Sequence, residues 1–297
     1  MIIDLHMHSH YSPDGRHSIP ELLDFFSEGD IAGLTDHETI GGWREFEGEA
    51  KNKGINPVLG IEWFSVKCHI LAYFLNGVPE KFCECMRERR SIEKNCMRLL
   101  YQTFKERFPQ LEPYDEVLKL RAHPENILGK PALSEAVAEA AGIDRTQAED
   151  MVREEKNKIP FNTLPKPFYP FNTRPTPFYP KKIIEKILEW DAVPVLAHPY
   201  RNFGGRTGRQ NKKDVEKKIR ELFEFGIRGL DVYSWNSNQF ELDHLIGLCD
   251  ELKLVPIIGS DFHHENKGLS PNDLKAIDKS LKKRVEKWAR NGIAKTS

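Results

Sequence analysis

Histidines and acidic residues stand in pairs at the ends of two apolar runs, with a spacing that suits metal coordination. His6 and His8 lie two apart at the end of the first run, and Asp261 and His263 lie two apart after residues 255–259. In an extended strand, residues two apart point to the same face. Each pair therefore presents two ligand groups to one side of a strand end. Asp14 follows in a turn just beyond the first run, and single candidates follow other apolar runs: His37, Glu62 and His198.

His69 is the exception, because it begins an apolar run, residues 70–74, instead of following one. It can reach the other candidates only if residues 64–67 form a hairpin that returns the chain beside Glu62. A lone histidine near a strand more often serves a turn or a cap than a metal, and we assign three others to that role: His17, His123 and His244. Six of the 11 histidines and three carboxylates then form the candidate ligand set.

The ligand types narrow both the metal and the reaction. Imidazole and carboxylate groups without a thiolate suit Mn²⁺, Fe²⁺ or Zn²⁺. Each such ion keeps about three to five protein ligands, so a shared set of this size supplies two or three divalent ions. Three divalent ions held by three carboxylates leave excess positive charge, which favours hydroxide and a multiply charged anion over a neutral amide or sugar. The expected chemistry is therefore phosphoester hydrolysis by a metal-bound hydroxide.

Short apolar runs separated by helical patterns predict the fold that positions these ligands. Strands that alternate with helices indicate a parallel α/β sheet, and seven strands suit a barrel better than an open sheet. Active sites of such barrels lie where the strands end, as nearly all the candidates do. The expected strands are residues 2–5, 31–35, 57–61, 70–74, 193–197, 229–232 and 255–259, and the helices between them include residues 19–27, 181–190, 215–225 and 240–252.

The alternation stops between residues 79 and 179, where one helical pattern follows another. Expected helices cover residues 82–104, with a stop at Pro109, residues 133–141, closed by Gly142, and a segment from an N-cap at Asp144 to about residue 157. We therefore expect a barrel of residues 1–79 and 180–297 with a mostly helical insertion of residues 80–179.

A Pro- and aromatic-rich decapeptide is duplicated at the end of this insertion. Residues 160–169 read PFNTLPKPFY and residues 170–179 read PFNTRPTPFY. The proline content favours extended structure over helix. We interpret the duplication as a connector that returns the chain to the barrel, with an aromatic flap over the site as the alternative.

Composition excludes several classes of protein. The 297 residues are 39% hydrophobic and 30% charged, as in ordinary globular proteins, and the net charge of −1 argues against a general electrostatic grip on nucleic acid or membrane. Basic residues between Lys275 and Arg290 suit the solvated face of a last helix, with a nucleic-acid patch as the weaker alternative. Five scattered cysteines suit reduced thiols. With no bilayer-length apolar run and no signal-peptide pattern, we expect a cytoplasmic protein.

The strand-end segments together resemble the PHP (polymerase and histidinol phosphatase) family. The resemblance covers residues 1–76 and 181–264 in family order. It implies a distorted seven-stranded β/α barrel, similar to a TIM barrel, with a site for two or three metal ions. The matching motifs are Asp4-Leu5-His6-Met7-His8-Ser9, Ser12-Pro13-Asp14-Gly15, Leu34-Thr35-Asp36-His37, Gly60-Ile61-Glu62, His69-Ile70-Leu71, Ala197-His198-Pro199 and Gly259-Ser260-Asp261-Phe262-His263.

The resemblance implies three metal positions, two of which share a bridging carboxylate. The first would be held by His6, His8, Glu62 and Asp261, the second by Glu62, His69 and His198, and the third by Asp14, His37 and His263.

The helical insertion resembles that of the family branch acting on nucleoside 3′,5′-bisphosphates and on the 5′ ends of short oligonucleotides. The matching pieces are Arg90-Ser91-Ile92, Asn95, Leu99 and Gly129-Lys130-Pro131. The chain departs from this branch at Lys130 and Ala132, where Arg and His are usual, and at His10, where Thr or Ser is usual. The resemblance makes Arg90, Asn95 and Lys130 candidates for substrate binding.

Other side chains beside the ligands are candidates for the reaction itself. Arg16 and Arg201 are placed to bind phosphate through two hydrogen bonds each, with a plain surface arginine as the alternative for both. His264 and Asp36 are candidates for orienting the ligands or for proton transfer to the leaving group. Residues 202–209, which are Gly-rich and basic, suit either the wall of an anionic pocket or a flexible crossover.

We therefore expect a phosphoesterase that acts on nucleotides or short oligonucleotides. A phosphorylated small molecule is the alternative substrate, as in histidinol-phosphate phosphatases, but the insertion favours a larger one. A non-catalytic binding module would have no need of the whole ligand set, and DNA polymerase proofreading would need a much longer chain. We expect neither a membrane nor an obligate protein partner.

Overall fold

The structure is a computed structural model that describes residues 1–65, 68–121, 128–158, 179–203, 212–234, 237–265 and 267–296. In this part of the chain, seven strands form one sheet in chain order, so each strand pairs with the next one along the sequence. The strands are β1 (Ile3–Met7), β2 (Ile31–Leu34), β3 (Asn56–Phe64), β4 (His69–Tyr73), β5 (Val193–Leu196), β6 (Gly229–Tyr233) and β7 (Val255–Ile258). The expected distorted seven-stranded α/β barrel is confirmed.

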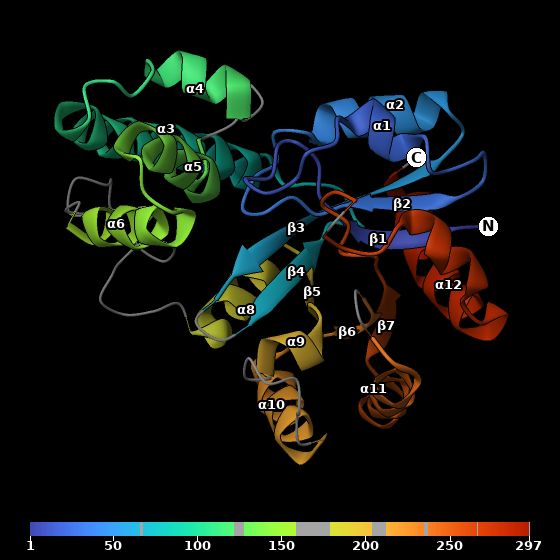
Figure 1. Ribbon diagram of the computed structural model, residues 1–297. Coiled ribbons are helices and arrows are strands. Elements are labelled where there is room, and N and C mark those ends of the chain that lie inside the picture. Colours follow the sequence, from blue (N-terminus) through green and yellow to red (C-terminus); the bar gives the residue numbers. More distant parts are fainter. Residues whose placement is uncertain are drawn as a thin grey trace.

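The segment after β7 returns beside β1 and nearly closes the barrel. Phe262 and Met7 form a parallel bridge, and the backbone N–H of Asp261 donates to the His6 carbonyl at 2.8 Å. Figure 1 shows the helices that lie outside the insertion arranged around the strands. They are α1 (Ile19–Leu23), α2 (Trp43–Asn52), α8 (Pro180–Glu189), α9 (Pro199–Phe203), α10 (Lys212–Phe225), α11 (Gln239–Leu252) and α12 (Lys279–Thr296), with a 3₁₀ helix at Pro271–Ala276.

The direction of β4 differs from the all-parallel expectation. β4 runs antiparallel to both β3 and β5, whereas the other pairs of neighbouring strands are parallel. A parallel crossover needs a dozen or more residues, and β3 and β4 are separated by four. The backbone N–H of Ser65 donates to the Cys68 carbonyl at 3.0 Å, which closes the connection as a hairpin.

In the described part of the insertion, four helices pack into a hydrophobic cluster of their own. These helices are α3 (Glu80–Arg107), α4 (Tyr114–Arg121), α5 (Lys130–Ala141) and α6 (Arg145–Lys158), drawn in green in Figure 1. Gly142 ends α5 in the left-handed conformation, and Asp144 Oδ1 accepts from the N–H of Gln147 at the start of α6. The short helix α4 has no counterpart among the expected helices.

Helix α3 joins the two hydrophobic clusters that the described residues form. Phe82 and Met86, in its first two turns, belong to the barrel core, whereas Met97 and Phe104 belong to the core of the insertion. The buried Arg89 lies between them, where it pairs with Glu38 and its guanidinium lies 5.2 Å from the centre of the Trp63 ring. One continuous helix thus anchors the insertion to the barrel at the ends of β2 and β3.

The remaining expectations concern the last helix, two segments rich in Pro or Gly, and membrane-spanning helices. Lys282 was expected on the solvated face of the last helix, but it is buried, because its ammonium group donates to the carbonyls of Met1 and Lys275. The duplicated decapeptide lies outside the described residues except for Tyr179, and so does most of the Gly-rich segment at 202–209. Among the described helices, none is long and apolar enough to cross a membrane.

Candidate metal centre

Glu62, near the end of β3, lies at the centre of the site. Its side chain is fully buried. One carboxylate oxygen, Oε1, lies 2.9 Å from His69 Nδ1 and 3.1 Å from His198 Nε2. The other oxygen, Oε2, faces three more imidazole nitrogens: His6 Nε2 at 3.1 Å, His8 Nε2 at 3.1 Å and His37 Nδ1 at 3.4 Å.

The β3–β4 hairpin is what brings His69 to this carboxylate. Antiparallel pairing places Phe64 opposite His69 and Glu62 opposite Leu71. The hairpin on which the inclusion of His69 depended is therefore present. The antiparallel strand is the local distortion of the barrel that allows a residue at the start of a strand to join residues at the ends of others.

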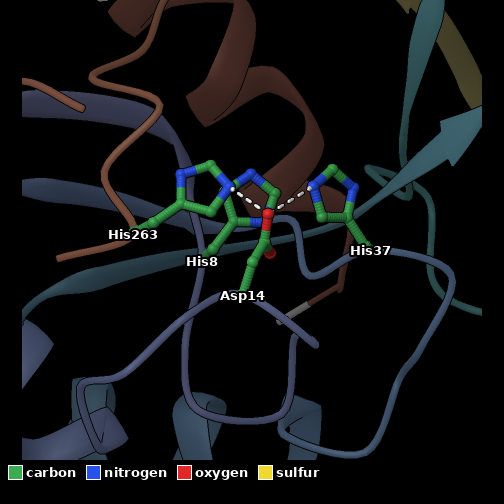
Figure 2. Close-up of side chains that lie close together, drawn as sticks. All are labelled: His8, Asp14, His37 and His263. Atoms are coloured by element: carbon green, nitrogen blue, oxygen red, sulfur yellow. Dashed lines mark ion pairs between the residues drawn. The ribbon is translucent and has the colours of Figure 1, made fainter. Parts of the chain in front are cut away.

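Among the described residues, the candidate ligands form three groups, and within each group the ligand atoms lie within 4.8 Å of one another. The first group is His6, His8, Glu62 and Asp261, the second is Glu62, His69 and His198, and the third is His8, Asp14, His37 and His263. These groups match the three that the family resemblance implies, except that His8 also lies in the third. The side chains of the third group come from three separate loops, and Figure 2 shows Asp14 between His37 and His263.

Buried nitrogens in these groups fit metal coordination better than hydrogen bonding. In the described part of the chain, His8 Nε2, His37 Nδ1 and His263 Nε2 lack a hydrogen bond of normal geometry. Each nevertheless lies 3.1–3.4 Å from an oxygen of Glu62 or Asp14. A buried polar atom without a partner is costly. A divalent cation coordinated by both the imidazole nitrogen and the carboxylate oxygen would satisfy both atoms. The side chains of these groups are therefore suited to bind divalent cations.

The charges of the site also fit cations. Burial lowers the pKa of His6, but Glu62 and the hydrogen bond to Asp231 outweigh it and raise that pKa well above its usual value. His8 follows the same pattern, since burial lowers its pKa but the nearby carboxylates of Asp261 and Glu62 outweigh burial and raise the pKa to about 9. The surrounding histidines hold the pKa of Glu62 well below its usual range, although burial opposes this. Because a metal ion binds deprotonated imidazole, its binding must release protons from His6 and His8.

Two candidate ligands have a left-handed backbone, which non-glycine residues rarely adopt. His198 has φ 26° and Asp261 has φ 53°. Each such residue costs about 1–3 kcal/mol and persists only where its surroundings fix it. The His198 N–H donates to Asp231 Oδ2 at 3.3 Å, and the Asp261 N–H donates to the His6 carbonyl. Strain at the ends of β5 and β7 is typical of functional sites.

Asp231 is a functional candidate that the motifs did not single out. It lies in β6 and is buried, and its Oδ2 accepts from His6 Nδ1 at 3.1 Å as well as from the His198 backbone. A proton on Nδ1 leaves Nε2 of His6 free to coordinate a metal. The available signal was a charged residue in the middle of a buried apolar strand, since such a charge needs a specific partner.

Replacing Asp231 by asparagine is expected to lower the metal affinity of the groups containing His6 and His198 by about 10- to 100-fold. The amide keeps the size of the side chain but weakens the orientation of both residues. Equilibrium dialysis against Mn²⁺ measures the effect, with D243N as the control, because Asp243 is exposed on α11. Equal affinities for D231N and D243N would rule out an orienting role for Asp231.

Among the described residues, two cationic side chains contact the candidate ligands directly. Arg201, a predicted phosphate-binding residue on α9, donates through Nη1 to Asp261 Oδ2 at 2.5 Å, and its side chain is 46% exposed. Lys267, which the sequence did not single out, lies 2.5 Å from Asp14 Oδ2. Positive charge thus lines the site at two separate carboxylates.

The structure favours an orienting role for Asp36. Both of its oxygens are occupied by Ser9, whose N–H and hydroxyl donate at 2.6 and 2.7 Å. Asp36 therefore fixes the loop after β1. His264 is half-buried, and burial together with the charges of Arg16 and Lys267 lowers its pKa. A neutral His264 is a weak proton donor. Arg16 is exposed, and its backbone N–H donates to the His263 carbonyl at 3.1 Å.

A basic cavity of about 370 Å³ lies between α3 and the loops after β1 and β2. Its lining includes Tyr11, Thr39, Arg87, Arg90, Ser91 and Lys94. Arg90 therefore has a place near the site, whereas Asn95 is exposed and is not among the described residues of this lining.

Lys130 is exposed at the first residue of α5, next to Gly129. A Cβ on Gly129 would lie 3.0 Å from Pro13 Cβ, so α5 begins against the Asp14 loop. Lys130 thus stands beside the mouth of the site.

The histidines assigned to ordinary roles have partners away from the ligand groups. His17 Nε2 lies 2.9 Å from Glu265, and His244 Nδ1 lies 2.6 Å from the Tyr200 hydroxyl. His123 lies outside the described residues.

The profile of the PHP domain matches residues 4–142 of the chain. A crystal structure of a candidate metal-dependent phosphoesterase from Bifidobacterium adolescentis superposes with a TM-score of 0.60 and 19% identity, over 95% of this chain and 96% of that one. An amidohydrolase from Chromobacterium violaceum with bound sulfate and no metal superposes with a TM-score of 0.58 and 20% identity, over 91% and 90%. Both likenesses concern the fold. The comparison with curated proteins gives no match.

Proposed function

We propose that the protein is a metal-dependent phosphoesterase that hydrolyses phosphate monoesters or terminal phosphodiesters of nucleotides or short oligonucleotides. The observation that carries the proposal is the connection of three ligand groups through Glu62 and His8, which supports two or three divalent ions in one site. The donor set suits Mn²⁺, Fe²⁺ or Zn²⁺. When bound, such ions supply an activated water and positive charge for phosphoryl oxygens.

The side chains around the ligands support an anionic substrate. Arg201 contacts Asp261 and its side chain is half exposed, so it brings positive charge to the edge of the ligand groups, where a phosphate would bind. Asp231 and Asp36 accept hydrogen bonds from His6 and Ser9, and so hold the ligand-bearing segments in place. These contacts orient the site before substrate binds, which is where the protein contributes most to such reactions.

The basic cavity beside α3 supports a substrate larger than a simple phosphate ester. Arg87, Arg90 and Lys94 bring positive charge to it, and Tyr11 adds an aromatic ring. A nucleotide leaving group carries both an aromatic base and further phosphate, which match such a lining. A small metabolite with a single phosphate would match fewer of these cationic side chains.

A substrate panel tests the proposal. The full chain, loaded with Mn²⁺, is assayed for phosphate release from a nucleoside 3′,5′-bisphosphate, a 5′-phosphorylated oligonucleotide and histidinol phosphate. We expect the nucleotide substrates to be hydrolysed at least about tenfold more efficiently, and R90M to reduce that preference without affecting histidinol phosphate. Faster hydrolysis of histidinol phosphate would favour the small-metabolite alternative. No hydrolysis of any ester by metal-loaded protein would refute the proposal.

A further inference from the structure

Lys267 contacts the very oxygen that Asp14 offers to the third ligand group. Asp14 Oδ2 lies 2.5 Å from the Lys267 ammonium, 3.3 Å from His263 Nε2 and 3.7 Å from His37 Nε2. The other oxygen, Oδ1, accepts a hydrogen bond from the Ser12 hydroxyl at 3.1 Å. Oδ2 is therefore the atom through which Asp14 would hold an ion, and the ammonium already occupies it.

The Arg201–Asp261 pair in the first group has a different geometry. Asp261 turns Oδ1 toward His6 and His8, at 3.4 and 3.5 Å, and offers Oδ2 to the guanidinium. Each oxygen of Asp261 thus serves one cation. In the third group a single oxygen of Asp14 has to serve both, so there, among the described residues, a side-chain cation opposes a metal ion directly.

The position of Lys267 is fixed by the fold. Its carbonyl accepts from the N–H of His263 at 2.9 Å, and its own N–H donates to the His264 carbonyl at 2.8 Å. Gly268, with φ 100°, follows it, and a Cβ there would lie 2.4 Å from the Asp261 carbonyl oxygen. The turn that carries Lys267 is therefore tied to Asp261 and His263, and both ionic partners are about three-quarters buried. The backbone around Lys267 therefore holds the Lys267–Asp14 ion pair in place, unlike a pair on the exposed surface.

We propose that Lys267 competes with the third divalent cation for Asp14, so that this ion is bound more weakly than the other two. An ion coordinated by Oδ2 at about 2.2 Å would lie within about 5 Å of an ammonium bonded to the same oxygen. At that separation like charges repel strongly in a partly buried site. The ammonium must move away for the third ion to bind, and it is then free to contact a phosphate oxygen. This inference rests on the metal centre of the proposed function.

Counting bound ions tests the competition without relying on activity. The full chain is stripped with a chelator and dialysed against a series of Mn²⁺ concentrations, and bound metal is measured by mass spectrometry. We expect three ions in the wild type, the third bound at least about tenfold more weakly. In K267M, which keeps the length of the side chain but not its charge, the third dissociation constant should fall at least about tenfold.

Three further variants make the result specific. K267R keeps the charge and should behave as the wild type, and so should K51M, because Lys51 forms an exposed pair with Glu47 at 2.8 Å. D14N should lose the third ion with or without K267M, which assigns the weak event to Asp14. An unchanged or weaker third ion in K267M would overturn the competition alone, while the first two ions kept the metal centre intact. A wild type that binds no ion would overturn both.

Discussion

Replacing Glu62 by glutamine is expected to reduce phosphoester hydrolysis by about a thousandfold or more and to remove ions from two of the three groups. Glu62 is the one carboxylate that both groups share, and its two oxygens face five imidazole nitrogens. The amide lacks the negative charge that offsets the ions, and its NH₂ group cannot coordinate a metal. Phosphate release and metal content are measured on the same Mn²⁺-loaded preparation.

Two variants separate this effect from general damage. E47Q removes a carboxylate from the exposed i,i+4 pair with Lys51 and should retain full activity and metal. D261N alters the first group only and should lose fewer ions than E62Q, with its fold verified by circular dichroism. An E62Q protein that hydrolyses substrate within about tenfold of the wild type, with unchanged metal content, is incompatible with a bridging role.

The strand-end residues were predictable because parallel strands bring their carboxyl ends to one mouth of a barrel. His6, Glu62, His198 and Asp261 are far apart in the sequence, yet each ends or follows an apolar run, and the structure places all four within the first two ligand groups. His69 needed an additional condition, the hairpin after Glu62. The expected strands at 57–61 and 70–74 leave eight residues between them, fewer than the dozen that a parallel crossover needs, and this short connection was the sequence signal for an antiparallel β4.

Other features depend on tertiary contacts that no local pattern encodes. Asp231 acts through the ring of His6, and the two are separated by 225 positions in the chain. Lys267 reaches Asp14 across 253 positions, and only the turn tied to His263 brings it there. The short helix α4 has a weak apolar periodicity of its own and is held by packing of Val117 and Leu118 in the insertion core. Contacts between side chains that are far apart in the chain are therefore what the sequence alone could not predict.

Gly259 shows how tightly the fold constrains the site. This residue follows β7, and a Cβ on it would lie 2.2 Å from the Cβ of His6 in β1. Neither segment can retreat, because the Ser260 N–H donates to Asp4 Oδ1 at 3.0 Å and the Asp261 N–H donates to the His6 carbonyl at 2.8 Å. The absence of a side chain at 259 is therefore what allows a ligand-bearing strand to lie against the strand that leads to Asp261.

Replacing Gly259 by alanine is expected to lower the free energy of unfolding by about 2–3 kcal/mol, because the added methyl group overpacks a fully buried contact. His6 should also be displaced, so Mn²⁺ affinity should fall together with stability. The matched control is G48A: Gly48 lies in α2 with no atom within 4 Å of an added Cβ, so this change should raise the free energy of unfolding by about 0.5–1 kcal/mol. Urea denaturation of the metal-free proteins gives both values. Changes of opposite sign in the free energy of unfolding would support the close approach of β1 and the segment that follows β7. A G259A protein as stable as G48A would mean that His6 does not lie against residue 259.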